Sequence, residues 1–178
     1  MKTQFFAGLL GAPGEKTMKT KKMPKLFIET TVFNFYFEGK HGKKQQDAIR
    51  LFEEIAKGRY EAYSSDEVFK ELIKASSDKH NKMKTLFEKY IKRTLETTPE
   101  TKCIAELYIK KGIIPAKSIK DALHIACAGV NNLDFVISYN LGHIIKTKTM
   151  IGTGFVNLRE GYRQIGLSTP TEVLNYDR

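Results

Sequence analysis

Short apolar runs alternate with longer amphipathic stretches along most of the chain. Runs of apolar or alternating residues, which are typical of strands, occur at 25–28 (KLFI), 60–65 (YEAYSS), 94–98 (TLETT) and 134–138 (DFVIS). Apolar residues at helical spacing predict helices at 43–58, 66–75, 83–91, 99–112 and 118–130, from 151 onward, and in a last turn at 168–174. Residues 29–36 (ETTVFNFY), directly after the first apolar run, are expected to turn the chain.

Strands that alternate with helices favour an α/β domain with a central parallel sheet and helices on both faces. The 178 residues are enough for one such domain with a full hydrophobic core, and residues 23–178 are expected to form it. Residues 1–22 differ from the rest, because they contain one short apolar run and five lysines against one glutamate. We expect this leader to be a disordered or non-native extension.

The chain is strongly basic, with a formal net charge of +10 and an isoelectric point near 9.5. Such an excess favours polyanionic partners, nucleic acid first and an acidic membrane surface or an acidic protein second. A solvated basic face without a partner would have the same composition. No apolar run reaches membrane-spanning length. Cys103 and Cys127 lie in apolar helical patterns, so we expect two buried free thiols and a cytoplasmic protein.

Acidic and amide side chains follow the predicted strands or begin the helices beside them. These residues are Glu29 after the first strand, Glu67 and Glu71 on the helix after the second, Asp121 in a first helical turn, and Asn140 after the strand at 134–138. In an open parallel sheet such positions meet at the carboxyl edge. Clustered carboxylates repel one another unless a hard cation such as Mg²⁺ or Mn²⁺ binds them. Such an ion can activate water against a phosphodiester, so in a basic domain the combination indicates a nuclease.

Most of these residues also have a structural interpretation. Ser118 and Asp121 have the spacing of a capping box, Glu71 could be a solvated residue on a helix face, and Asn140 could form a turn. Glu29 has no evident structural role at the end of an apolar strand, where burial of a carboxylate is costly. The residues alone therefore indicate a metal-dependent site and leave its chemistry open.

Four segments resemble segments of PIN-domain proteins in their order and in their residues: LFIETTVFNFYF, SSDEVFKELIKA, DALHIACAGVNNLDFVISYNLGHI and TPTEVL. The resemblance is to the bacterial and archaeal VapC-like toxins of type II toxin–antitoxin systems, and it covers residues 25–174. It implies a three-layer PIN-like fold, with a central parallel β-sheet flanked by helices, and a Mg²⁺- or Mn²⁺-dependent endoribonuclease. The four acidic positions of the family fall on Glu29, Glu71, Asp121 and Asn140, of which the first three would hold the metal.

Two positions depart from the pattern of that family. Glu29 replaces the usual Asp and lengthens this ligand by one methylene, and Asn140 replaces an acid and removes one negative charge. The second change weakens the case for a second tightly held metal. The alternative to the nuclease is therefore a catalytically weak or inactive PIN-fold module that binds RNA or protein.

Side chains near the acids are expected to contact substrate or to support the site. Thr30 and Thr31 would place a hydroxyl near the metal or the phosphate, and Lys120 would contact the RNA backbone. His124 and His143 are candidates for acid–base work, because imidazole titrates near neutrality. For His124 we favour a structural hydrogen bond, and for His143 both interpretations stay open. The resemblance also implies RNA as substrate, a cognate antitoxin and a homodimer.

Overall fold

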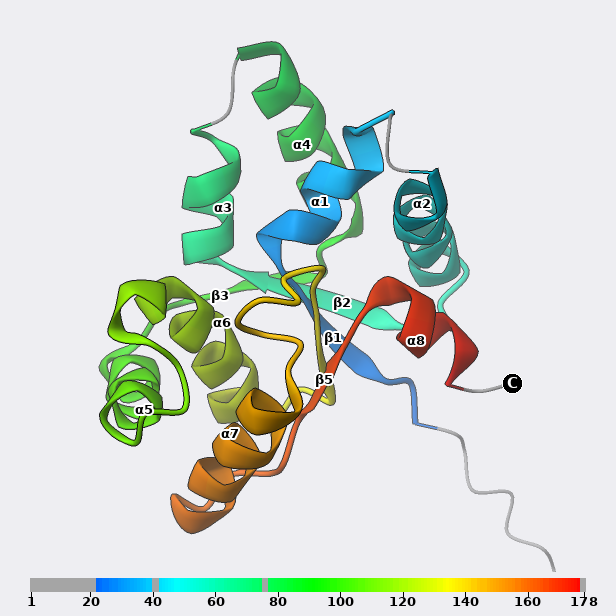
Figure 1. The fold of residues 1–178 in the computed structure, drawn as a ribbon. Coiled ribbons are helices and arrows are strands. Elements are labelled where there is room, and N and C mark those ends of the chain that lie inside the picture. The colour runs from blue at the N-terminus through cyan, green and yellow to red at the C-terminus, as the bar shows by residue number, and fades with distance from the viewer. Residues whose placement is uncertain (1–21, 40–41, 75–76, 177–178) are drawn as a thin grey trace, which may run out of the picture.

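One parallel sheet forms the centre of the protein (Figure 1). The computed structural model describes residues 22–39, 42–74 and 77–176. The leader expected at 1–22 lies outside the described residues apart from its last position. Within the described residues the sheet has five strands in the order β3-β2-β1-β4-β5. Their bounds are β1 Lys25–Ile28, β2 Glu61–Ser65, β3 Arg93–Leu95, β4 Phe135–Ile137 and β5 Gly166–Ser168.

Helices cover both faces of the sheet and make a three-layer α/β arrangement, which confirms the predicted fold class. One layer is formed by α1 Thr30–Phe37, α2 Gly42–Ala56, α3 Asp66–Leu72 and α4 Ser77–Tyr90, drawn above the sheet in Figure 1. The other is formed by α5 Pro99–Lys110, the short 3₁₀ turn Ala116–Ser118, α6 Ile119–Val130 and α7 Thr147–Arg159. The last helix, α8 Pro170–Asn175, packs beside α2.

The central strand β1 is buried on both faces because helices cover each of them. Leu26, Phe27 and Ile28 are all 0% exposed. This accounts for a continuous apolar run in place of the alternating pattern of a half-exposed strand. β1 pairs in parallel with β2 on one side and with β4 on the other, with Ile28 opposite Ile137.

The strand order reverses at β1, and this creates the position where a site is expected. From β1 the chain moves outward through β2 to β3, then crosses the sheet to β4 and β5 on the other side. The carboxyl ends of β1 and β4 therefore lie side by side at a topological switch point, where ligands bind in open α/β sheets. The backbone N–H of Glu29 donates to the carbonyl of Ile137 at 3.1 Å, which joins the two strand ends.

The prediction of a turn after the first strand is wrong, because residues 30–37 form helix α1. Threonine, valine and aromatic residues have modest helix propensity, and local sequence therefore gives a weak signal here. The helix is stabilised by its cap and by packing: Glu29 caps its N-terminus, and Val32 and Phe33 are completely buried among α2, α3 and α4. Tertiary contacts therefore decide the conformation of this segment.

Other differences from the sequence prediction concern short or exposed features. Strand β5 was not predicted, since three residues with one apolar side chain between Gly166 and Ser168 carry no strand pattern. The third strand is Arg93–Leu95, so it ends before most of the predicted 94–98. Cys103 is exposed, so the expectation that it is buried is wrong, whereas Cys127 is buried. Burial, with a smaller contribution from Asp66, raises the pKa of the Cys127 thiol to about 12.

A buried hydrogen bond joins α5 to α7 beneath the sheet. The hydroxyl of Tyr108 donates to Oδ1 of Asn157, and both side chains are 0% exposed. Among the described residues, Nδ2 of Asn157 has no partner. The Tyr108 bond is therefore the one that compensates this amide for its loss of water.

We expect Tyr108→Phe to lower the free energy of unfolding by about 1–3 kcal/mol, because it leaves the buried Oδ1 of Asn157 without a donor. Urea denaturation followed by circular dichroism measures the change. The control is Tyr162→Phe, which removes a hydroxyl that donates to Glu100 at the surface and should change stability by less than about 0.5 kcal/mol. Equal losses in the two variants would contradict the role given to the buried bond.

Candidate active site

Glu29 joins the end of β1 to the beginning of α1. It is 4% exposed, and its Oε2 accepts three hydrogen bonds. The donors are Thr31 N at 3.1 Å, Thr31 Oγ1 at 2.5 Å and Ser138 Oγ at 2.8 Å. The first of these is the N-terminal cap of α1, so this acid does have a structural role, contrary to the expectation from sequence. The described hydrogen bonds all reach Oε2, so Oε1 is the oxygen left for a ligand.

Thr31 and Ser138 connect this carboxylate to the end of β4. Thr31 Oγ1 accepts from the backbone N–H of Tyr139 at 2.8 Å, and Ser138 Oγ accepts from that of Asn140 at 2.9 Å. Each hydroxyl therefore donates to Glu29 and accepts from the turn after β4. This arrangement fixes Glu29 and the segment that carries Asn140 relative to each other.

Glu71, near the end of α3, reaches the same edge from a different layer. Its Oε1 accepts from Lys120 Nζ at 2.8 Å, and its Oε2 accepts from the hydroxyl of Thr30. Nε2 of His124 lies 3.7 Å from the same Oε2. Burial alone would raise the pKa of Glu71, but the neighbouring His124, Lys120 and Thr30 outweigh it and lower the pKa to about 2. Glu71 is therefore a carboxylate at neutral pH.

Asp121, in the first turn of α6, is held by Asn140. Nδ2 of Asn140 donates to Asp121 Oδ1 at 3.1 Å, and Oδ1 of Asn140 accepts from the backbone N–H of His143 at 3.1 Å. Burial raises the pKa of Asp121, and the nearby His124 and His143 oppose this only in part. Asn140 thus uses both ends of its amide and orients the Asp121 carboxylate.

The capping box predicted for Ser118 and Asp121 is not formed. Ser118 precedes α6, but its side chain makes no capping hydrogen bond. The reason is conformational, because the preceding 3₁₀ turn leaves Ser118 at φ −105° and ψ 34° instead of the extended geometry of a capping residue. The Ser118 hydroxyl instead interacts with the Asp121 carboxylate and favours its charged form. This interaction opposes part of the rise in the pKa of Asp121 that burial causes. Asp121 therefore does not serve as a helix cap.

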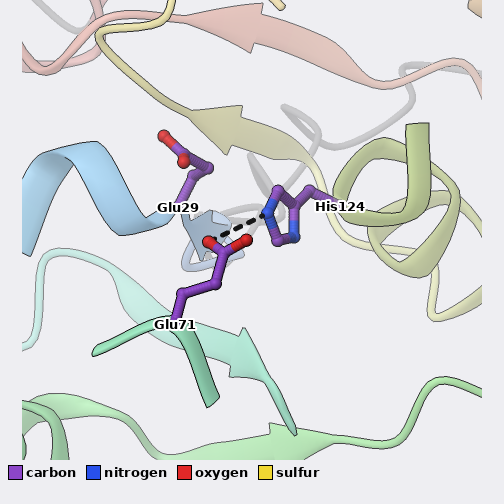
Figure 2. A group of neighbouring side chains, drawn as sticks. All are labelled: Glu29, Glu71 and His124. Atoms are coloured by element: carbon purple, nitrogen blue, oxygen red, sulfur yellow. Dashed lines mark ion pairs between the residues drawn. The ribbon is translucent and has the colours of Figure 1, made fainter. Parts of the chain in front are cut away.

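Glu29, Glu71 and His124 each offer one ligand atom within a common space, and these atoms all lie within 4.8 Å of one another. Figure 2 shows the three side chains, which come from the end of β1, from α3 and from α6. His124 is 2% exposed and packs on Phe27, with ring centroids 5.8 Å apart. The separation of 3.7 Å between its Nε2 and Glu71 exceeds an ordinary hydrogen bond. His124 therefore contacts Glu71 through Nε2, and Nδ1 has no hydrogen-bond partner among the described residues.

The donor set fits a divalent cation. Two carboxylates and an imidazole nitrogen lie together, with a third carboxylate, that of Asp121, one helical turn before His124. Oxygen and imidazole ligands in this number suit Mg²⁺, Mn²⁺ and related ions. Lys120 also offsets part of the negative charge, from the exposed side, since its side chain is 53% exposed.

The remaining residues predicted from sequence lie around this group. Thr30 donates to Glu71, and Lys120 pairs with Glu71, so both contact an acid directly. His143 is half-buried and borders a pocket of about 370 Å³ that is also lined by Lys146 and Lys148. The contribution of Ser138 was not predicted. The available signal in the sequence was its position, directly after an apolar strand and shortly before the site residue Asn140.

Comparison with known proteins identifies the architecture. No model of a known protein family matches the sequence, and no curated protein matches it either. A solved structure, VapBC2 from Rickettsia felis bound to a DNA fragment from its promoter, aligns with a TM-score of 0.50 over 82% of this chain and 98% of the other. The protein has a PIN-like fold.

The PIN-like fold is shared at only 11% sequence identity, so the likeness concerns the arrangement of strands and helices. The likeness therefore does not extend to the individual residues at the carboxyl edge of the sheet. Among the described residues, no helix combines the length and the hydrophobicity needed to cross a membrane.

Thr31→Val should lower the free energy of unfolding by about 1–3 kcal/mol, because it deprives the Tyr139 N–H of its acceptor and Glu29 of a donor. Thr31→Ser keeps the hydroxyl and loses only a methyl group, so its loss should stay below about 1 kcal/mol. Urea denaturation of both variants tests this. A serine variant as unstable as the valine variant would show that the methyl group, and not the hydroxyl, stabilises this junction.

Proposed function

We propose that this protein is a metal-dependent endoribonuclease that hydrolyses RNA phosphodiester bonds and acts as the toxin of a type II toxin–antitoxin pair. The observation that carries the proposal is the group of Glu29, Glu71 and His124 at the switch point of a PIN-like fold, with Asp121 outside this group but one helical turn before His124. Glu29, Glu71 and Asp121 lie far apart in the sequence, and Glu29 and Asp121 are held by hydroxyl or amide groups.

Glu29 and Glu71 would hold Mg²⁺ or Mn²⁺, with Asp121 bound directly or through water. When bound, such an ion lowers the pKa of the attacking water and stabilises the charge that develops on the phosphate. Thr31 and Ser138 occupy Oε2 of Glu29 and leave Oε1 as the oxygen that would bind the ion. Asn140 orients Asp121, in place of the fourth acid of the family.

The basic character of the chain supports RNA as the substrate. Lys146 and Lys148 line the 370 Å³ pocket that His143 borders, and His143 is hydrogen-bonded through its backbone to Asn140. The basic groups of this pocket could contact RNA phosphates. Binding through such lysines weakens as salt concentration rises. Lys120 is half-exposed and would exchange Glu71 for a substrate phosphate.

A protein partner is supported by an exposed apolar stripe on α7. Ile151, Phe155 and Leu158 are 62%, 66% and 60% exposed and lie at spacings of four and three residues, on one face of the helix. An exposed apolar group of this kind marks an interaction site more often than a solvated surface. Lys110, Lys111 and other basic groups lie near Phe155 around a small pocket, which favours an acidic partner such as an antitoxin over a second basic copy.

The second candidate function is a catalytically inactive PIN-fold module that binds RNA or protein. Two observations favour it: Lys120 already pairs with Glu71, and Asn140 replaces an acid with a neutral amide that is already hydrogen-bonded to Asp121 and to the His143 backbone. The two candidates differ in their response to a metal, since an inactive module gains no stability from Mn²⁺.

The nuclease proposal predicts that a single-stranded RNA is cleaved in the presence of Mn²⁺ or Mg²⁺ and that EDTA stops the reaction. Glu71→Gln and Asp121→Asn should each reduce the rate by at least about 100-fold, because the loss of even an outer partner of a metal ligand costs about 10- to 100-fold. Gel analysis of a labelled RNA gives the rates, and circular dichroism checks that each variant is folded.

Glu88→Gln is the matched control, because Glu88 is an exposed acid on α4, away from the site, and this variant should keep the wild-type rate. Purification of all variants in parallel reveals any contaminating nuclease as cleavage common to every sample. Cleavage that survives EDTA or both site substitutions would overturn the proposal. An absence of cleavage together with an absence of metal-linked thermal stabilisation would favour the binding module.

A further inference from the structure

We infer that His124 supplies a nitrogen ligand to the metal site formed with Glu29 and Glu71, and that the resulting mixed donor set selects Mn²⁺ over Mg²⁺. The inference rests on the proposed metal-dependent function and adds to it a ligand and a metal preference. It is carried by the position of the imidazole, by a distance that does not suit a hydrogen bond, and by the burial of the ring.

His124 is positioned by α6, three residues after Asp121 and therefore on the same face of the helix. The ring is almost completely buried and packs against Phe27 of the central strand. A side chain confined in this way cannot swing out to solvent. Its Nε2 faces Glu71, and a ligand atom of Glu29 completes the group within 4.8 Å.

The distances match ligands around one ion better than direct bonds between side chains. Hydrogen bonds between nitrogen and oxygen span about 2.7–3.2 Å, whereas Nε2 of His124 lies 3.7 Å from Oε2 of Glu71. Ligands bound about 2.0–2.2 Å from a shared metal lie about 3 Å apart at right angles and about 4.4 Å or less when opposite. The observed separation falls inside this range, and the 4.8 Å limit of the whole group lies just above it.

The buried ring of His124 has few polar contacts. Among the described residues, Nδ1 has no hydrogen-bond partner, and Nε2 lies 3.7 Å from Oε2 of Glu71. Coordination through Nε2 would offset part of the cost of burying this polar ring. It would place the proton of the neutral ring on Nδ1. A protonated His124 paired with Glu71 is the competing explanation.

A nitrogen donor has a consequence for metal choice. Mg²⁺ binds through oxygen ligands and water, whereas imidazole suits transition-metal ions. A site of two carboxylates and one imidazole should therefore bind Mn²⁺ more tightly than Mg²⁺. Replacement of the imidazole by an amide should remove most of this difference and leave the oxygen ligands to hold either ion.

Pulsed electron paramagnetic resonance of the full-length protein loaded with Mn²⁺ tests the ligand directly. The wild type should show ¹⁴N coupling from one bound imidazole, and ¹⁵N-labelled histidine should replace that signal with its ¹⁵N counterpart. His124→Gln should bind Mn²⁺ about tenfold more weakly or worse and lose the coupling, with little change for Mg²⁺. Metal-linked thermal shifts give both affinities without reference to RNA cleavage.

His143→Gln is the control, because His143 lies beside Asp121 but outside the group of three, so this variant should keep the coupling. Mn²⁺ binding to the wild type without ¹⁴N coupling would overturn the inference and leave the nuclease proposal intact. Coupling that persists in His124→Gln would also overturn it. No binding of either ion would overturn the proposed function as well. If His124→Gln fails to fold, the wild-type and His143→Gln spectra decide, since loss of coupling in the latter would assign the nitrogen to His143.

Discussion

Glu29 loses nearly all contact with water at the point where β1 ends, and a carboxylate in that position must be hydrogen-bonded or bound to a cation. Its Oε2 meets this requirement with donors from Thr31 and Ser138. Those donors belong to α1 and to the segment after β4, so one buried oxygen joins the two central strands and the first helix. The same bonds leave the other oxygen available, and a structural requirement thereby creates a ligand position.

The other two acids respond differently to burial because their neighbours differ. Glu71 is surrounded by Lys120, Thr30 and His124, which together hold its pKa far below the ordinary value. Asp121 has weaker support, and burial raises its pKa. A cation between them would favour the charged form of both groups. The site thus combines one acid whose charge its neighbours favour with one whose charge is costly to bury.

The switch point explains why these residues meet. Strands β1 and β4 are adjacent only because the chain crosses the sheet after β3, and this crossing places α6 with Asp121 and His124 beside the end of β1. A chain with 11% identity to VapBC2 therefore reaches the same arrangement of layers. The core residues maintain the crossing, and the crossing brings Glu29, Glu71 and His124 together.

Sequence alone determined the fold class, four of the five described strands and most helices, because apolar periodicity is a local property. It also pointed to Glu29 and Glu71, which the structure brings together with His124. It did not determine α1 or β5, whose residues have weak propensities and depend on packing or on a partner strand. Nor did it reveal that Glu29 caps a helix, that Ser118 does not, or that His124 faces two carboxylates. Each of these depends on backbone angles at a junction or on distances across the sheet, which exist only once distant segments have packed together.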